Sequence, residues 1–392
     1  MVAPRGVNGA APGLLVVGDV VTDVVARHGE PLAPHTDTAA RIAVTPGGAG
    51  ANVACWAARC GARVRLLGRV GADSADWHRA ALLAAGVEPA LRVDPELPTA
   101  VVVALVDAAA ERTLVTDSGA AFRLGPEDWD DALLDGPWDG SRADHGAWDG
   151  SRVDDDRAHD GPLRAGPPAL APLRGPARPP EGRARIGHVH LSGYLFFSAP
   201  GRELAAAVRE AALARGVPVS VDPASAGFLR RLGIEAFLDA VRGTDLLLPN
   251  AAEAALLSGR DEPRDAAAAL SSRLGGTVVV TLGAAGALAA ERGTVTARVA
   301  APDAAAVDTT GAGDAFTGGL LAARLAGADL PGALAAGCRA GAEAVTVVGG
   351  RPPGRRADAT GLHHGAPSRS GTPGPGKAAP ERRGGEPTGT RL

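Results

Sequence analysis

Residues 308–316 combine a turn of small residues with a carboxylate that could do chemistry. The segment reads Asp-Thr-Thr-Gly-Ala-Gly-Asp-Ala-Phe, and an apolar stretch with helical spacing follows it. Gly311, Ala312 and Gly313 leave their backbone N–H groups unobstructed at the start of this predicted helix, and such a terminus binds anions, above all phosphate. Asp314 would repel a phosphate there, so we interpret it as a base that accepts a proton from a hydroxyl nucleophile. The alternative is an ordinary helix N-cap with glycines for close packing.

A glycine loop nearer the N-terminus could hold a small polar ligand. Gly47 and Gly48 open the segment Gly-Gly-Ala-Gly-Ala-Asn-Val-Ala, which leads into a predicted helix. Glycines let a ligand approach the backbone, and Asn52 offers both a donor and an acceptor. Asp23 lies just past the first predicted strand, where ligands sit in open α/β sheets, and its carboxylate can accept two hydroxyls of a polyol. A packing turn and a solvated loop carboxylate are the alternatives.

Two further segments follow predicted strands. Asn250-Ala-Ala-Glu253 begins a predicted helix, and a Glu on the first turn can hold Mg²⁺ through water or cap the helix. Thr281-Leu-Gly-Ala-Ala-Gly286 could line the phosphates and ribose of a nucleotide, or form a tight turn. His188 and His190 face one side of a strand; without a third ligand nearby, we favour packing over a metal site.

The composition limits the classes of function. Of the 392 residues, 45% are hydrophobic but only 3% aromatic, as expected for helices rich in Ala, Val and Leu packed on buried parallel strands. The net charge of -4 gives no reason to expect nucleic acid or an anionic membrane as partner. Lys377 is the only lysine. This excludes a Walker A loop and the strand lysine of protein kinases, since both need a lysine in their motif.

Cysteine usage and hydropathy favour a cytoplasmic protein. Cys55, Cys60 and Cys338 contain no C-x-x-C pair, which argues against a zinc site or a disulfide framework. No apolar stretch reaches membrane-spanning length. We therefore expect a soluble intracellular chain without membrane contact.

Apolar runs and Ala-rich helical segments alternate along the chain, which predicts a doubly wound α/β sheet. Strands are predicted at 14–21, 64–70, 186–191, 217–221, 245–248 and 277–281, and helices at 51–60, 75–85, 201–215, 228–241, 251–258, 264–274, 312–325 and 331–345. Two stretches interrupt this alternation: 39–44, and the pair 100–106 with 112–116. They predict a small β lid outside the main sheet.

Two regions are too rich in Gly, Pro and charge to bury a core. Residues 136–183 are predicted to be a disordered insertion that contains Trp-Asp-Gly-Ser-Arg twice, and 351–392 are predicted to be a disordered tail without a catalytic role.

Taken in order, the loop at 47–54, Asn250 with Glu253, the segment 280–286 and above all 308–316 resemble the ribokinase-like, or PfkB, family of carbohydrate kinases. The resemblance spans about Leu14 to Gly350. It implies a three-layer α/β/α sandwich over 13–350, with a mostly parallel central sheet and a β lid from about 24–45 and 97–118.

The resemblance also implies phosphoryl transfer from ATP to a primary hydroxyl of a free sugar or related polyol, with Asp314 as base. The amides of Gly311–Asp314, including Ala312 and Gly313, would form the anion hole, and the sugar would be bound by Asp23, Gly47, Gly48 and Asn52. ATP and Mg²⁺ would be bound by Asn250, Glu253, Thr281, Gly283 and Gly286, with Glu253 on the metal through water. Cys338 would lie near the adenine edge, or be a small core residue, and a monovalent cation such as K⁺ would be held by Asp308, the Thr310 carbonyl and Gly350.

Some positions depart from ribokinases themselves. Ala49 stands where ribokinases usually carry Lys, and the strand at 188–194 lacks the acidic residue that they place near its end. The sequence thus predicts a family member other than ribokinase. A nucleoside kinase and a non-catalytic sugar-binding regulatory protein remain as alternatives. The lid strands contain no aromatic residue to stack on a base, which favours a sugar. Members of this family often dimerise through their lids, so a homodimer is a further expectation.

Overall fold

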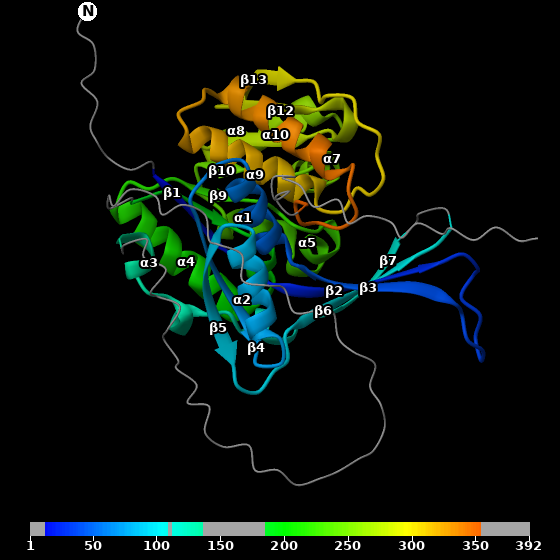
Figure 1. Ribbon diagram of the computed structural model, residues 1–392. Helices are drawn as coiled ribbons and strands as arrows, with labels where there is room; N and C mark the ends of the chain where they lie inside the picture. The colour runs from blue at the N-terminus through cyan, green and yellow to red at the C-terminus, as the bar shows by residue number, and fades with distance from the viewer. Residues whose placement is uncertain (1–11, 109–111, 136–184, 354–392) are drawn as a thin grey trace, which may run out of the picture. The chain divides into compact units, whose positions relative to one another are not determined.

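The computed structural model describes residues 12–108, 112–135 and 185–353 (Figure 1). In this part of the chain a nine-stranded sheet has the order β13-β12-β11-β10-β9-β8-β1-β4-β5, and neighbours are parallel except where β12 pairs with β11 and β13. Its strands are β1 Gly13–Val17, β4 Val64–Gly71, β5 Val87–Asp94, β8 Ile186–Leu191, β9 Val219–Val221, β10 Leu246–Leu247, β11 Thr277–Thr281, β12 Ala287–Glu291 and β13 Thr294–Val299. The predicted insertion and all but the first three residues of the predicted tail lie outside the described residues.

Helices cover both faces of this sheet. They are α1 Ala49–Arg59, α2 Ala75–Ala84, α3 Ala132–Asp135, α4 Ala199–Ala214, α5 Ala226–Leu232, α6 Ile234–Ala240, α7 Ala251–Ser258, α8 Pro263–Leu274, α9 Ala312–Leu325 and α10 Leu330–Ala344. Short 3₁₀ turns occur at Gly119–Arg123, Pro126–Asp128, Gly193–Phe197 and Gly283–Ala285. Helices α1, α2, α9 and α10 share one apolar cluster, and α3 to α8 share the other (Figure 1).

The strands explain this layering. Leu14 and Val16 of β1 belong to the first cluster, whereas Leu15 and Val17 belong to the second. Successive side chains of a strand point to opposite faces, so a continuous apolar run can bury both faces of a parallel sheet. The three-layer α/β/α fold with a mostly parallel sheet is therefore confirmed.

A second sheet has four strands in the order β3-β2-β6-β7. Its strands are β2 Val21–His28, β3 Ala40–Gly47, β6 Ala100–Val106 and β7 Arg112–Asp117. β2 pairs antiparallel with β3 and parallel with β6. This is the small β element predicted outside the main sheet, and we call it the lid.

Several predicted boundaries were wrong for identifiable reasons. The run 14–21 is two strands: β1 ends at Val17, and β2 begins at Val21 in the lid. The break includes Gly18, where the chain passes so close to the end of β8 that a Cβ would lie 2.7 Å from Ser192 Cβ. The helix predicted at 228–241 divides at Gly233, whose φ of 96° does not fit a helix. The strands β5, β12 and β13 were not predicted.

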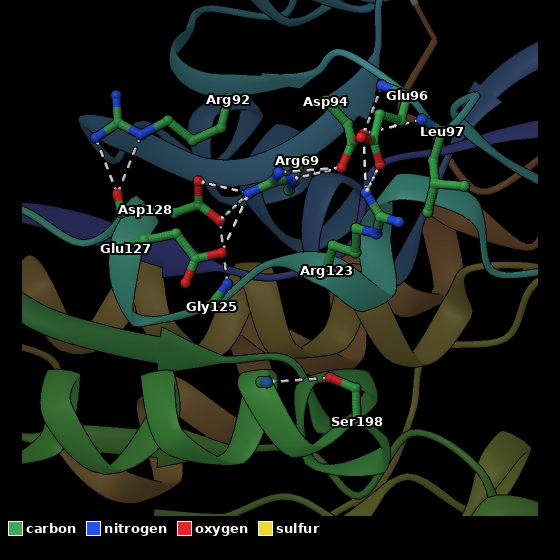
Figure 2. A network of polar contacts seen from close by, with 11 residues as sticks. Arg69, Arg92, Asp94, Glu96, Leu97, Arg123, Gly125, Glu127, Asp128 and Ser198 are labelled. Atoms are coloured by element: carbon green, nitrogen blue, oxygen red, sulfur yellow. Dashed lines mark hydrogen bonds and ion pairs between the residues drawn. The ribbon is translucent and has the colours of Figure 1, made fainter.

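A polar network fixes the chain after the lid to the main sheet (Figure 2). Arg69 of β4 donates to Asp94 of β5 and to Asp128, each at 3.0 Å. Arg92 of β5 donates to the backbone oxygen of Asp128, and Arg123 donates to Glu96 at 2.8 Å. Because Asp94 and Asp128 are buried, their bonds to Arg69 hold the segment around Asp128 in place, whereas the exposed pair of Arg123 and Glu96 adds little.

Candidate active site

A cavity of about 850 Å³ lies between the lid and the carboxyl ends of the central strands. Many of the predicted site residues line it: Asp23, Gly48, Asn52, Asn250, Glu253, Thr281, Asp308, Thr310, Gly313 and Asp314. Among the described residues, the lining does not include Gly47, Gly283, Gly286, Gly311, Ala312, Cys338 or Gly350. Cys338 is instead 5% exposed in the core cluster that contains Phe316 and Leu334. Residues from distant parts of the sequence thus meet in one cavity.

Asp314 lies on the first turn of α9, which begins at Ala312 as predicted. The N-cap residue Gly311 is left-handed, with φ 72°, and a Cβ on it would come within 2.5 Å of Gly350 Cα. The first N–H groups of a helix have no partner within the helix, so they are suited to an anion. Ala312 N makes a long contact of 3.4 Å to Thr309 O, which a ligand could replace.

Asn52 and Asp314 form a direct contact across the cavity wall. Asn52 Nδ2 donates to Asp314 Oδ2 at 2.9 Å. Burial raises the pKa of Asp314 to about 8; the hydrogen bond from Asn52 lowers it, and the charges of Asp222, Asp19 and Asp23 raise it further. A carboxyl with a pKa near the working pH can exchange a proton with a substrate.

Asp23 reaches the same cavity from strand β2. Its carboxylate lies over Gly47, where a Cβ would come within 2.0 Å of Asp23 Oδ2. A larger residue at position 47 would therefore displace the Asp23 carboxylate. Burial raises the pKa of Asp23 to about 6, and the charge of Arg351 opposes this shift. Its oxygens are suited to accept hydroxyls of a bound ligand.

Asp19 lines the cavity and was not predicted from the sequence. It accepts hydrogen bonds from Ala49 N at 2.7 Å, Gly50 N at 3.1 Å and Ser192 Oγ at 2.8 Å. These bonds fix the N-terminus of α1, and therefore Asn52, relative to β1. A signal existed in the Gly18-Asp19 pair that ends the first strand, but the partners of Asp19 lie far away in the chain.

Asn250 and Glu253 form a capping box at the start of α7. Asn250 Oδ1 accepts from Glu253 N and Glu253 Oε2 accepts from Asn250 N, both at 2.9 Å. The capping alternative is thus realised, yet both residues also line the cavity. Burial raises the pKa of Glu253 to about 7, and Asp222 adds to the shift. Glu253 and Asp222 line the same cavity, and carboxyls suit a hard cation that takes most of its ligands from water and phosphate.

Within the ranges that the structure describes, three or more His, Cys, Asp or Glu side chains nowhere gather into a metal-binding group. His188 and His190 bind Ser220 Oγ at 2.8 and 2.9 Å, and His190 Nε2 lies 3.0 Å from Asp222 Oδ2. The packing interpretation of this pair therefore holds, and the chain of contacts ends at Asp222 in the cavity.

Asp308 organises the turn before α9. Its Oδ1 accepts from Thr310 N at 2.9 Å and from Thr310 Oγ1 at 2.6 Å, and its Oδ2 accepts from Gly349 N at 3.0 Å. Arg27 of the lid lies 3.5 Å from the same Oδ2. The Asp308 carboxylate, which was expected to hold a monovalent cation, is thus already close to the positive charge of Arg27.

The residues 349–351 close the site from behind, which corrects the predicted start of the tail. Trp56 Nε1 donates to Gly350 O at 2.9 Å. Arg351 donates to Asn52 Oδ1, Cys55 Sγ and Gly47 O, each at 3.1 Å. Composition alone placed Arg351 in a tail without a role, because its partners precede it by about three hundred residues.

Aromatic side chains form one wall of the cavity. Phe122, Tyr194 and Phe228 line it, and the rings of Tyr194 and Phe228 lie 5.7 Å apart in an edge-to-face arrangement. The lid strands supply none of these rings, as the sequence predicts. Phe122 comes from the turn after β7, and the other two follow β8 and β9.

The comparison with known proteins decides the family. The model of the pfkB family carbohydrate kinases matches residues 11–134 and 184–356. This chain belongs to the pfkB family. It is therefore a phosphotransferase with an alcohol group as acceptor, a sugar or nucleoside kinase of that family. The predicted insertion falls between the two matched stretches.

Individual relatives agree with this family. A fructokinase from Klebsiella pneumoniae is 31% identical over 330 residues, which are 82% of this chain and 87% of the relative. An adenosine kinase from Sinorhizobium meliloti superposes with a TM-score of 0.68 at 20% identity, covering 88% of this chain and 96% of that one. A putative ribokinase II from E. coli in complex with ATP and Mg²⁺ gives 0.65 at 23%, covering 86% and 94%. These two structures support the fold.

In the described part of the chain, no helix has the length and apolar character needed to span a membrane.

Proposed function

We propose that this pfkB family member transfers the γ-phosphoryl group of ATP to a primary hydroxyl of a free sugar or related polyol, with Asp314 as the base. The observation that carries the proposal is the position of Asp314, hydrogen bonded to Asn52 at the N-terminus of α9. A base at a helix N-terminus can take a proton next to the place where phosphate binds. Burial raises its pKa to about 8, and the aspartates of the cavity add to this shift, so the carboxylate is basic enough to take the proton.

The reaction needs one proton transfer and one displacement. Asp314 Oδ accepts the proton of the substrate hydroxyl, and the hydroxyl oxygen forms a bond to the γ-phosphorus. The bond from that phosphorus to the bridging oxygen breaks, and ADP leaves with the electron pair. The N–H groups at the start of α9 stabilise the charge on the phosphoryl oxygens, because they are already aimed at this place.

The sugar and the nucleotide would occupy different ends of the cavity. Asp23 and Asn52, beside β1 and the lid, would bind hydroxyls of the sugar. Asn250, Glu253 and Thr281, after β10 and β11, would face the nucleotide, and Glu253 would hold Mg²⁺ through water. When bound, Mg²⁺ neutralises charge on the phosphates. Gly283 and Gly286, with positive φ of 58° and 94°, shape the turn next to Thr281.

A monovalent cation beside the anion hole would share Asp308 with Arg27. The guanidinium lies 3.5 Å from Asp308 Oδ2 and already supplies positive charge there. We therefore expect K⁺ to stimulate the reaction without being essential.

A nucleoside kinase is the second candidate, because Phe122, Tyr194 and Phe228 line the cavity. Aromatic rings favour the flat base of a nucleoside, although they can also pack against the apolar face of a sugar. The absence of aromatics from the lid strands therefore distinguishes the two substrates less sharply than the sequence suggests.

The two candidates and the non-catalytic alternative are separated by one substrate screen. ADP release is measured with ATP and Mg²⁺ over pentoses, hexoses, deoxy-ketogluconate, inositol and nucleosides, with and without K⁺. Purified Asp314→Asn serves as the control for contaminating kinases. Sugar-dependent ADP release supports the proposal, nucleoside-dependent release supports the second candidate, and no release with any acceptor contradicts the assigned chemistry.

We also propose that the lid forms a homodimer. Val44, Val24, Val103 and Val115 lie in register across β3, β2, β6 and β7. Alternate residues of these strands, such as Asp23, Val102 and Thr116, line the cavity, so the valine row lies on the opposite face. Val44 is 56% and Val115 57% exposed. An apolar row of this kind favours contact with a second copy.

A further inference from the structure

Arg351 makes three hydrogen bonds behind the active site, and none of its partners is a carboxylate. Its Nε donates to Asn52 Oδ1, its Nη1 to Cys55 Sγ and its Nη2 to Gly47 O, each at 3.1 Å. A guanidinium can only donate. Each acceptor that faces it must therefore present an oxygen or a sulfur.

This one-sided chemistry decides how the side chain of Asn52 is oriented. The amide has an oxygen at one end and an N–H group at the other. Because the oxygen must face Arg351, the N–H must face Asp314, where Nδ2 lies 2.9 Å from Oδ2. The opposite orientation would place N–H against N–H at Arg351, and would place an oxygen against the carboxylate at Asp314.

The backbone on either side of Arg351 is fixed, so the side chain has little freedom to leave. Trp56 Nε1 holds Gly350 O, and Gly349 N donates to Asp308 Oδ2. Gly350 lies so close to Asn52 that a Cβ would approach its Nδ2 within 2.4 Å. Residues 349–351 therefore join the loop at 47–52 to the turn at 308–314.

We propose that Arg351 is a positioning residue that fixes the amide of Asn52 so that its N–H points at the base Asp314. The inference rests on the proposed function, which makes Asp314 the base. Arg351 does not line the cavity in the described structure, so it acts through Asn52 rather than on the substrate.

The orientation matters for the charge state of Asp314. A donor from Asn52 stabilises the ionised carboxylate, whereas an oxygen in its place would stabilise the protonated acid. Asp19, Asp23 and Asp222 face Asp314 from the β1–β2 turn, from β2 and from the end of β9, and all three raise its pKa. Tyr194 also faces this group, with its own pKa raised by burial. Losing the oriented donor would leave these opposing charges uncompensated.

The test measures the pKa of Asp314 directly, by carboxyl ¹³C NMR of the full chain labelled on aspartate, with the signal assigned from Asp314→Asn. In Arg351→Met, which keeps the apolar stem but has no donor, we expect the pKa to rise by about one unit, the size of a lost charge-assisted hydrogen bond. The turnover number at neutral pH should fall about tenfold, with a smaller change in KM, because fewer bases are ionised.

Two further variants separate orientation from charge. Arg351→Gln keeps a donor without the charge and should fall between Met and wild type. If Arg351→Lys restores the pKa while Gln behaves like Met, the effect is simple charge and the proposal is wrong. In an Asn52→Ala background, Arg351→Met should add no further rise, since the two changes remove the same contact.

Arg242→Gln, at an exposed pair with Asp239, is the matched control and should leave the pKa unchanged. An unchanged pKa in Arg351→Met, with or without a lower melting temperature, would overturn the inference. Failure of the proposed function would look different: Asp314→Asn would keep its turnover while the NMR shift in Arg351→Met still occurred.

Discussion

Asn52 and Asp314 lie 262 residues apart in the chain and 2.9 Å apart in space. The contact joins the N-terminus of α1 to the N-terminus of α9, and these are the two helix starts that carry the glycine-rich motifs. Because Asp19 fixes the first and Asp308 the second, the glycine loop at 47–54 and the predicted anion hole are held in one geometry.

The activity should depend on pH through Asp314. Burial raises the pKa of its carboxyl to about 8, so a growing fraction is protonated as the pH falls below that value. As only the ionised form can accept a proton, kcat/KM should fall about tenfold per pH unit on the acid side. Because Asp314 interacts with other carboxyls of the cavity, the acid limb of the pH profile gives an apparent pKa of the coupled group. A profile that stays flat through neutral pH would contradict this prediction.

Replacing Glu253 by Gln should raise the Mg²⁺ concentration needed for half-maximal activity. An amide oxygen can still accept from Asn250 N, so the helix cap and the melting temperature should change little. Loss of the charge should raise the requirement roughly tenfold, as for other residues that support a metal. The measurement is a Mg²⁺ titration at fixed ATP. Glu262→Gln, at the start of α8, is the control. If the Mg²⁺ concentration for half-maximal activity is unchanged, Glu253 does not bind the metal.

Arg27→Gln should make the reaction more dependent on K⁺. Without the guanidinium next to Asp308, a monovalent cation becomes the remaining source of positive charge there. Stimulation by K⁺ over a choline salt should grow by about threefold to tenfold, equivalent to roughly 1 kcal/mol. The control is Arg41→Gln, because Arg41 of β3 lies opposite Arg27 in the register of the lid sheet. Equal K⁺ dependence in wild type and Arg27→Gln would show that Arg27 has no such role.

Val115→Glu should dissociate the proposed lid dimer. Its side chain is 57% exposed on the apolar row, so a charge there costs the monomer little but would be repeated in an interface between two copies. Sedimentation velocity should show a dimer for wild type and a monomer for the variant. Leu213→Glu on α4, where the side chain is 80% exposed, should leave the dimer intact. A monomeric wild type would exclude this assembly.

The sequence predicted the parts of the fold in which local pattern and tertiary packing agree. Helix α9 at 312–325 and strand β11 at 277–281 have the predicted bounds. In each, an apolar run is delimited by glycine or threonine, so the local sequence pattern and the packed structure mark the same ends. Strand β12 is short and Ala-rich and carries little strand signal, whereas β13 reads Thr-Val-Thr-Ala-Arg-Val, an alternating β-branched pattern that was overlooked. Gly233 broke a helix that periodicity alone would continue.

The site shows a similar division. Motifs on helix starts, such as Asp314 and Asn52, could be found because glycine spacing marks them. Asp222 and Arg351 could not, since each acts through partners far away in the chain; the Gly18-Asp19 pair offered a signal, but the partners of Asp19 are equally distant. Cys338 was placed at a nucleotide edge by family analogy, yet its environment is the apolar core. Contacts between distant residues therefore account for what the sequence missed.

The most direct test of the account is the turnover number of Asp314→Asn with the best acceptor from the substrate screen. Asparagine keeps the size of the side chain but cannot take the proton, so kcat should fall by about a hundredfold or more while KM changes little. Burial raises the pKa of Asp314 above its unfolded value of 3.8 to about 8, so ionisation destabilises the fold as pH rises through that window. The variant should therefore melt no lower than wild type at alkaline pH, which excludes unfolding as the cause. A folded Asp314→Asn with near-normal kcat would contradict the assignment of Asp314 as the base.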